Sequence, residues 1–158
     1  MCSKKDGDDI LLAMPSSDYV KLLVESPILF FVFSHKAFEI ELAQIRRLAV
    51  EALDSGGEVV DEICRRLHFL KLVYKYHCVA EDEVLFQALD AQVKNVIFTY
   101  SLEHNSIDVL FSSIFDCLDR LQKEKEDVPV LFNELTCSIG TIQTTISQHM
   151  LKEEEQIF

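Results

Sequence analysis

Apolar residues recur at spacings of three and four residues in four long stretches of this chain, which is the period of amphipathic α-helices. Segments containing polar residues, glycine or proline interrupt this pattern and predict turns near residues 54–57, 90–95 and 123–129. The expected helices cover about residues 27–54, 58–89 and 96–123, followed by one that carries residues 131–153. Long helices joined by short turns predict an all-α fold, an up-down-up-down four-helix bundle.

The residues expected to face the interior mix apolar side chains with histidine and glutamate. In the second helix they are Ile63, Leu67, Leu70, Val73, His77, Ala80, Glu81, Val84 and Leu85. Residues 1–25 are mixed and polar, so we expect them to form a loosely ordered arm ahead of a metal-binding domain that covers residues 26–158.

Two His-x-x-x-Glu pairs, His77–Glu81 and His149–Glu153, lie on the inward stripes of the second and fourth helices. Residues four apart on a helix lie one above the other on the same face. Each pair can therefore present a ring nitrogen and a carboxylate to one point in the interior.

The spacing of four histidines places them at one height in the bundle. Halfway between His35 and His77 lies residue 56, between His77 and His104 residues 90 and 91, and between His104 and His149 residues 126 and 127. All three midpoints fall in predicted turns. Because residues equidistant from a short turn share a level in an antiparallel bundle, we expect the four imidazoles to meet.

Four imidazoles and two carboxylates in a helical interior indicate metal binding. Without a metal, each buried polar group that lacks a partner would cost about 1–3 kcal/mol. Four nitrogen ligands and two carboxylates exceed the needs of one tetrahedral zinc ion, so we predict two ions, each bound by two histidines and bridged by both glutamates. Mixed nitrogen and oxygen ligands with open positions favour iron or manganese, and zinc is a substitute.

Other residues near this group are weaker candidates. Asp108 follows His104 by four residues and is a further candidate, as an oxygen ligand or a hydrogen-bond partner. His68 precedes His77 by nine residues, half a turn out of phase, and is expected to point away. Cys78 directly follows His77, is rotated by about 100° from it around the helix axis, and is expected to be a packed thiol. Acidic residues expected at solvated positions are Asp82, Glu83 and Glu103.

Composition narrows the function classes. The formal net charge of −12 argues against nucleic acid and anionic membranes as partners. Five cysteines without a C-x-x-C pair are typical of free thiols in a reducing compartment. The first twenty residues carry no long apolar run, and no stretch approaches 18 apolar residues, so we expect neither a signal peptide nor a membrane span.

The order of these ligands resembles that of haemerythrin-like domains: His35, then His77-Cys-Val-Ala-Glu81, His104, and His149-Met-Leu-Lys-Glu153. The resemblance covers about residues 26–158. Several segments are similar to the N-terminal haemerythrin repeats of plant BRUTUS-type E3 ubiquitin ligases, namely Ser26–Leu29, Tyr76–Val84, Val93–Val96, Thr99–His104 and Ser147–His149.

This resemblance implies a diiron regulatory domain of an iron-responsive ubiquitin ligase, which senses iron, or oxygen, in iron homeostasis. It implies two glutamate-bridged iron ions, partners among the other domains of the ligase and regulatory proteins, and a location in the nucleus or cytoplasm. The domain itself would not be catalytic. The alternatives are an O₂-binding or storage haemerythrin and a non-haem diiron oxidase. Oxygen-carrying haemerythrins have His-x-x-x-His on the third helix, where this chain has His104-Asn-Ser-Ile-Asp108, which disfavours O₂ transport.

Overall fold

The computed structural model describes residues 27–55, 57–89, 96–123 and 128–156, all of which are helical. The predicted arm over residues 1–25 lies outside them. The helices are α2 (Pro27–Ser55), α3 (Gly57–Ala80), the π-helical segment η1 (Glu81–Leu85), α4 (Phe86–Leu89), α5 (Val96–Lys123) and α6 (Val128–Gln156). No helix in these segments is long and apolar enough to cross a membrane.

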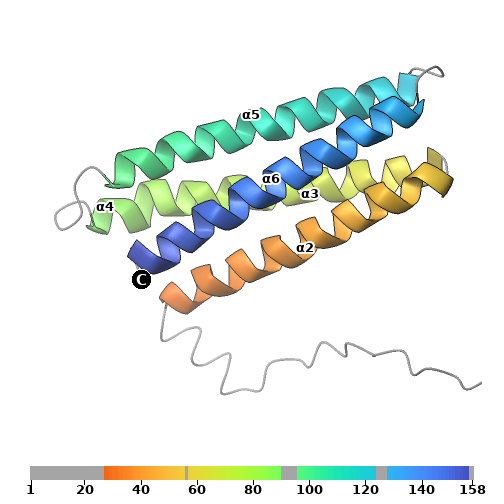
Figure 1. Ribbon diagram of the computed structural model, residues 1–158. Helices are drawn as coiled ribbons and strands as arrows, with labels where there is room; N and C mark the ends of the chain where they lie inside the picture. Colours follow the sequence, from red (N-terminus) through yellow and green to blue (C-terminus); the bar gives the residue numbers. More distant parts are fainter. Residues whose placement is uncertain (1–26, 56, 90–95, 124–127, 157–158) are drawn as a thin grey trace, which may run out of the picture.

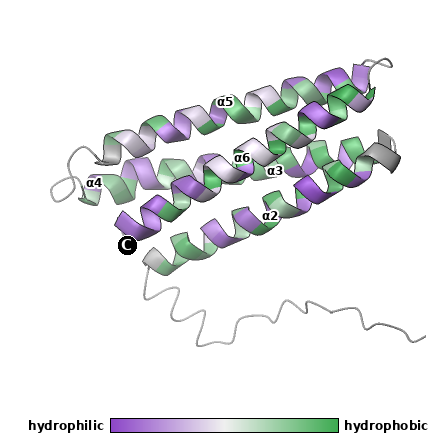
Figure 2. Ribbon diagram, viewed as in Figure 1, coloured by the Kyte–Doolittle hydropathy of each residue, from purple (hydrophilic) through white to green (hydrophobic). Residues whose placement is uncertain are grey.

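The described helices form an antiparallel four-helix bundle, as the sequence predicts (Figure 1). α3, η1 and α4 run on as one continuous arm of the bundle. Neighbouring helices pack in the order α2, α3, α5, α6 and back to α2, so α2 and α5 are diagonal to each other. Figure 2 shows hydrophobic and hydrophilic residues alternating along every helix, the pattern of helices that bury one face only.

Proline sits in the first turn of two helices. Pro27 is the first residue of α2, as expected, and Pro129 is the second residue of α6. The sequence pattern assigned Pro129 to the preceding turn, whereas the helix already includes it. A proline in the first helical turn loses no hydrogen bond, because the amide groups there have no partner within the helix.

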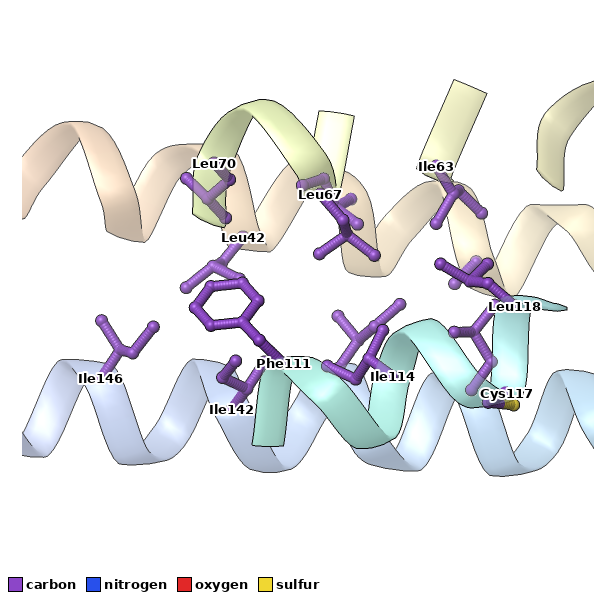
Figure 3. Close-up of a cluster of buried hydrophobic side chains, with 14 of the residues drawn as sticks. Leu42, Ile63, Leu67, Leu70, Phe111, Ile114, Cys117, Leu118, Ile142 and Ile146 are labelled. Atoms are coloured by element: carbon purple, nitrogen blue, oxygen red, sulfur yellow. The ribbon is translucent and has the colours of Figure 1, made fainter. Parts of the chain in front are cut away.

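An apolar core fills the bundle on the side of the α2–α3 and α5–α6 turns. Side chains from all four long helices point into it (Figure 3). The labelled members are Leu42, Ile63, Leu67, Leu70, Phe111, Ile114, Cys117, Leu118, Ile142 and Ile146. This packing fixes the rotation of each helix, and so decides which residues face inward in the other half of the bundle.

Two expected core positions in the second helix are wrong. Val73 and Val84 are 39% and 69% exposed, whereas Tyr74 and Phe86 are 4% and 0% exposed. Tyr74 follows Leu70 by four residues and precedes the inward residue His77 by three, so it lies on the same helix face as both.

The inward position falls on Phe86 rather than Val84 because of η1, and the expected core residue Leu85 is half-buried. The π-helical hydrogen bonds of Glu81–Leu85 join residues five apart, and the amide of Phe86 donates to the carbonyl oxygen of Glu81. The inward residue after Glu81 is therefore five positions on, at Phe86, rather than four. The segment begins at one of the predicted ligands, which is a common place for a π-helical turn.

Candidate metal centre

All six predicted ligands come together in the half of the bundle beyond the apolar core. Within the described residues they form two groups of possible metal ligands that share both glutamates. In each group the candidate atoms lie within 4.8 Å of one another. One group is His35, His77, Glu81 and Glu153, and the other is Glu81, His104, His149 and Glu153. All six side chains are buried.

Glu81 reaches both pairs of histidines. Its Oε1 lies 3.0 Å from His77 Nε2 and 3.6 Å from His35 Nε2, while its Oε2 lies 3.4 Å from His104 Nε2. Each oxygen of this carboxylate therefore faces a different group, which is the arrangement of a bridging ligand.

Glu153 spans the same pairs from the opposite helix. Its Oε2 lies 3.6 Å from His35 Nε2, and its Oε1 lies 3.2 Å from His149 Nε2 and 3.8 Å from His104 Nε2. The two carboxylates thus stand between two imidazole pairs, and the six groups suit a dinuclear metal site.

The atoms that face the centre of this cluster lack hydrogen bonds of good geometry. Among the described residues, they include the Nε2 atoms of His77, His104 and His149 and both carboxylate oxygens of Glu81 and Glu153. Leaving such atoms buried without partners costs about 1–3 kcal/mol each, so the cluster fits a group that all of them contact at once. Metal ions with nitrogen and oxygen ligands meet that requirement.

Protons partly balance the charges of the cluster in the metal-free chain. Burial acts to raise the pKa of Glu81, but its close contacts with the ring nitrogens of His104, His35 and His77 outweigh it and hold that pKa well below its usual range. Burial acts to lower the pKa of His104, but Cys78, Glu153 and Glu81 outweigh it and raise that pKa to about 12. A metal ion must therefore displace a proton to reach this imidazole.

The Nδ1 atoms of the first two histidines contact polar side chains on neighbouring helices. His35 Nδ1 lies 2.9 Å from Glu154 Oε1, on α6. His77 Nδ1 lies 3.3 Å from Ser34 Oγ, on α2. Because a carboxylate only accepts, the Nδ1 of His35 carries the proton, and its Nε2 is directed at the cluster.

The other two histidines are held in the same way. His104 Nδ1 lies 3.2 Å from Asp82 Oδ2, and Ser101 Oγ donates to the other oxygen of Asp82 at 2.5 Å. His149 Nδ1 lies 2.9 Å from Glu103 Oε2. Our expectation that Asp82 and Glu103 are simply solvated is wrong, whereas Glu83 is exposed as expected.

The four Nδ1 partners share a sequence feature. Each is the immediate neighbour of a predicted ligand on its own helix, and each contacts the histidine of the adjacent helix. These contacts run from α2 to α3, from η1 to α5, from α5 to α6 and from α6 back to α2, a closed circuit that we call the Nδ1 ring: Ser34, Asp82, Glu103 and Glu154. The adjacency is visible in the sequence, but the contact across helices is not.

Comparison with known proteins agrees with this geometry. Residues 26–158 match the family model described as the Hemerythrin HHE cation binding domain. The chain belongs to the haemerythrin HHE family. It is also 50% identical over 136 residues to a zinc finger protein BRUTUS-like and 46% identical over 134 residues to zinc finger protein BRUTUS, both of Arabidopsis thaliana.

These alignments cover 86% and 84% of this haemerythrin chain but only 11% and 10% of the two relatives. The chain therefore spans about a tenth of the length of the curated relatives it matches. No solved structure matches it.

Two of the remaining candidates lie apart from the haemerythrin cluster. The Asp108 carboxylate is 65% exposed and lies 3.1 Å from Lys71 Nζ, so the structure does not bring it to either ligand group. His68 is exposed, with its ring against Phe115 at a centroid distance of 4.1 Å, and it points away from the cluster as expected.

Cys78 is a buried free thiol, in line with the prediction of a packed side chain. Burial raises its pKa, so the group is a neutral thiol near neutral pH. It lines a surface pocket of about 380 Å³ between α3 and α5, together with Asp82 and His104. Through this pocket the His104 side of the cluster borders the protein surface.

Proposed function

We propose that this haemerythrin domain binds two iron ions and serves as the iron-sensing, regulatory part of an iron-responsive E3 ubiquitin ligase. The observation that carries the proposal is the pair of ligand groups that share two buried glutamates. The family match and the similarity to BRUTUS and BRUTUS-like proteins support it.

The chain's own residues divide the work of binding. His35 and His77 would hold one ion, His104 and His149 the other, and the shared carboxylates would bridge them. When bound, two adjacent irons supply a redox-active pair with open coordination positions. Manganese and zinc are substitutes for the same nitrogen and oxygen ligands.

Metal occupancy would act through stability. The cluster buries carboxylate and imidazole atoms that lack hydrogen bonds of good geometry, so the metal-free fold carries part of their desolvation cost. Ions that bind only the folded form then raise its stability as their free concentration rises above Kd, with a logarithmic dependence on that concentration. A domain that is ordered when iron is plentiful and loosened when iron is scarce can report iron supply to the rest of a ligase.

Partners and location follow from the same proposal. The other domains of the parent protein and regulatory proteins would respond to the state of this domain, inside the cell, in the nucleus or cytoplasm. The domain itself would not catalyse a reaction. Reversible O₂ storage is less well supported, because each ligand group offers two imidazoles and Asp108 does not supply another donor.

Metal analysis after anaerobic reconstitution with ferrous iron tests the proposal. The full chain should retain about two irons, one for each ligand group, after removal of unbound metal. The double variant His77→Ala/Glu81→Ala should lose them, whereas His68→Ala, an exposed histidine outside the cluster, should retain them. An absence of stoichiometric metal in the wild-type chain would leave a helical interaction module instead.

A further inference from the structure

The metal centre has an approximate internal two-fold symmetry. The α2–α3 half contributes His35 and the His77–Glu81 pair, and the α5–α6 half contributes His104 and the His149–Glu153 pair. Each half supplies one histidine from its first helix and one His-x-x-x-Glu pair from its second. The two ligand groups are therefore equivalent in the type and number of their donors.

The Nδ1 ring follows this symmetry at one pair of positions. Asp82 and Glu154 each directly follow the glutamate of their half, and each contacts the first histidine of the other half. Both are half-buried carboxylates. They give His35 and His104 acceptors of the same chemical type, at 2.9 and 3.2 Å from Nδ1.

The other pair of positions breaks the symmetry. Ser34 and Glu103 each directly precede the first histidine of their half, and each contacts the second histidine of that same half. One is a neutral hydroxyl and the other a carboxylate. Among the described contacts of the Nδ1 ring, the two halves differ in chemical type here.

The hydroxyl is also the poorer acceptor by geometry. Ser34 donates its own proton to the carbonyl oxygen of Phe31 at 2.7 Å, so its oxygen accepts from His77 Nδ1, at 3.3 Å. Glu103 meets His149 Nδ1 at 2.9 Å and is fixed by Lys152 Nζ at 2.6 Å. Lys152 offsets part of the charge, but a short hydrogen bond to a carboxylate is still stronger than a long one to a hydroxyl.

The aromatic surroundings of the two halves are comparable. The ring of His77 packs against Phe31 and Phe38 at centroid distances of 5.5 and 5.3 Å. In the other half, Tyr100 packs against His149 and Phe86 against His104, at 5.7 and 6.0 Å. The Nδ1 acceptor is thus the difference that bears most directly on the donor strength of the imidazoles.

We propose that the two ions bind with unequal affinity, and that the His35–His77 group is the weaker one. An anionic acceptor at Nδ1 makes Nε2 a better donor and holds the ring in place, and losing such a partner costs about 10–100-fold in metal affinity. This inference rests on the dinuclear site of the proposed function. The His104–His149 group binds its ion first. The affinity of the His35–His77 group then sets the free iron concentration at which both sites are occupied.

Stepwise metal titration tests the inference. Metal-free chain is titrated anaerobically with ferrous iron against a competing chelator, and the two binding constants are fitted. We expect two steps that differ by about 10-fold or more. Ser34→Glu, which installs the residue of the other half, should strengthen the weak step and leave the tight one. Glu103→Ser, the reciprocal variant, should weaken the tight step. Both variants should therefore bring the two binding constants closer together.

Two controls separate the Nδ1 contact from a general effect of charge. Ser112→Glu adds the same charge at an exposed serine of α5 outside the Nδ1 ring, and should leave both steps unchanged. Glu103→Gln keeps the side-chain size but removes the charge, and should weaken the tight step in the same direction as Glu103→Ser. If Ser34→Glu fails to fold by circular dichroism, Ser34→Asp replaces it.

Each result has a defined meaning. Two wild-type steps of equal affinity, or a Ser34 variant that strengthens the tight step or neither step, would overturn the inference while leaving a two-ion centre intact. A wild-type chain that binds fewer than two ions would instead overturn the proposed function on which the inference rests.

Discussion

Removal of the metal should destabilise the domain strongly, and the structure sets the size of the effect. Each ligand group draws its donors from three arms of the bundle, and the two groups, which share Glu81 and Glu153, together draw on all four. The unfolded chain cannot hold these donors together, so metal binds the folded form almost exclusively. Stripping the ions therefore removes the whole binding free energy from the folded state.

The magnitude follows from linkage. At a free metal concentration of 100 times Kd, one site contributes about 2.7 kcal/mol, so two sites contribute about 5 kcal/mol. For a chain of 158 residues, 1 kcal/mol shifts Tm by about 2–4 °C. We therefore expect Tm to differ by about 10–20 °C between the chain with excess ferrous iron and the chain with excess chelator.

Thermal unfolding followed by far-ultraviolet circular dichroism measures this difference, since all described residues are helical. Glu81→Gln removes the charge of a shared ligand, so its Tm should be nearly the same with iron and with chelator. His68→Ala should keep the full difference, because that residue lies outside the cluster. If the wild-type chain binds two irons and its Tm is unchanged, the link from occupancy to stability is refuted.

Three further results are expected. Iron binding at neutral pH should release protons, because the pKa of His104 is raised in the metal-free chain, and iron affinity should fall as the pH is lowered. Calorimetry in two buffers of different ionisation enthalpy measures the proton release. Equal binding enthalpies in the two buffers would contradict this prediction. Leu42 lies in the core, so Leu42→Ala should lower the free energy of unfolding, measured in urea, by about 2–5 kcal/mol. Val84 is exposed, so Val84→Ala should change it by under about 0.5 kcal/mol. Similar losses of unfolding free energy in the two variants would refute the burial assignment. Under native conditions iodoacetamide should modify the exposed thiol of Cys137 but not the buried thiol of Cys117, and mass spectrometry that finds both modified at the same rate would contradict the packing.

Much of the fold could be predicted from local sequence pattern. Helical periodicity and the polar breaks located four long helices, because amphipathic spacing and turn residues are properties of short segments. The equal distances of neighbouring histidines from the turns between them also predicted the cluster. In an antiparallel bundle with short loops, these distances fix the level of each residue along the bundle axis. The six predicted ligands meet in the structure, and their binding of metal stays a prediction.

Tertiary structure decided the features that depend on contacts between helices. The spacing of apolar residues does not predict the π-helical segment that begins at Glu81. Because of this segment, Phe86 faces inward in place of Val84. Likewise, Asp82 and Glu103 are charged residues beside ligands, which sequence alone assigns to solvent, yet each holds a histidine of the next helix. Periodicity reports on one helix at a time, whereas hydrogen bonds of about 3 Å depend on how neighbouring helices are rotated against one another, and only the packed core fixes that rotation.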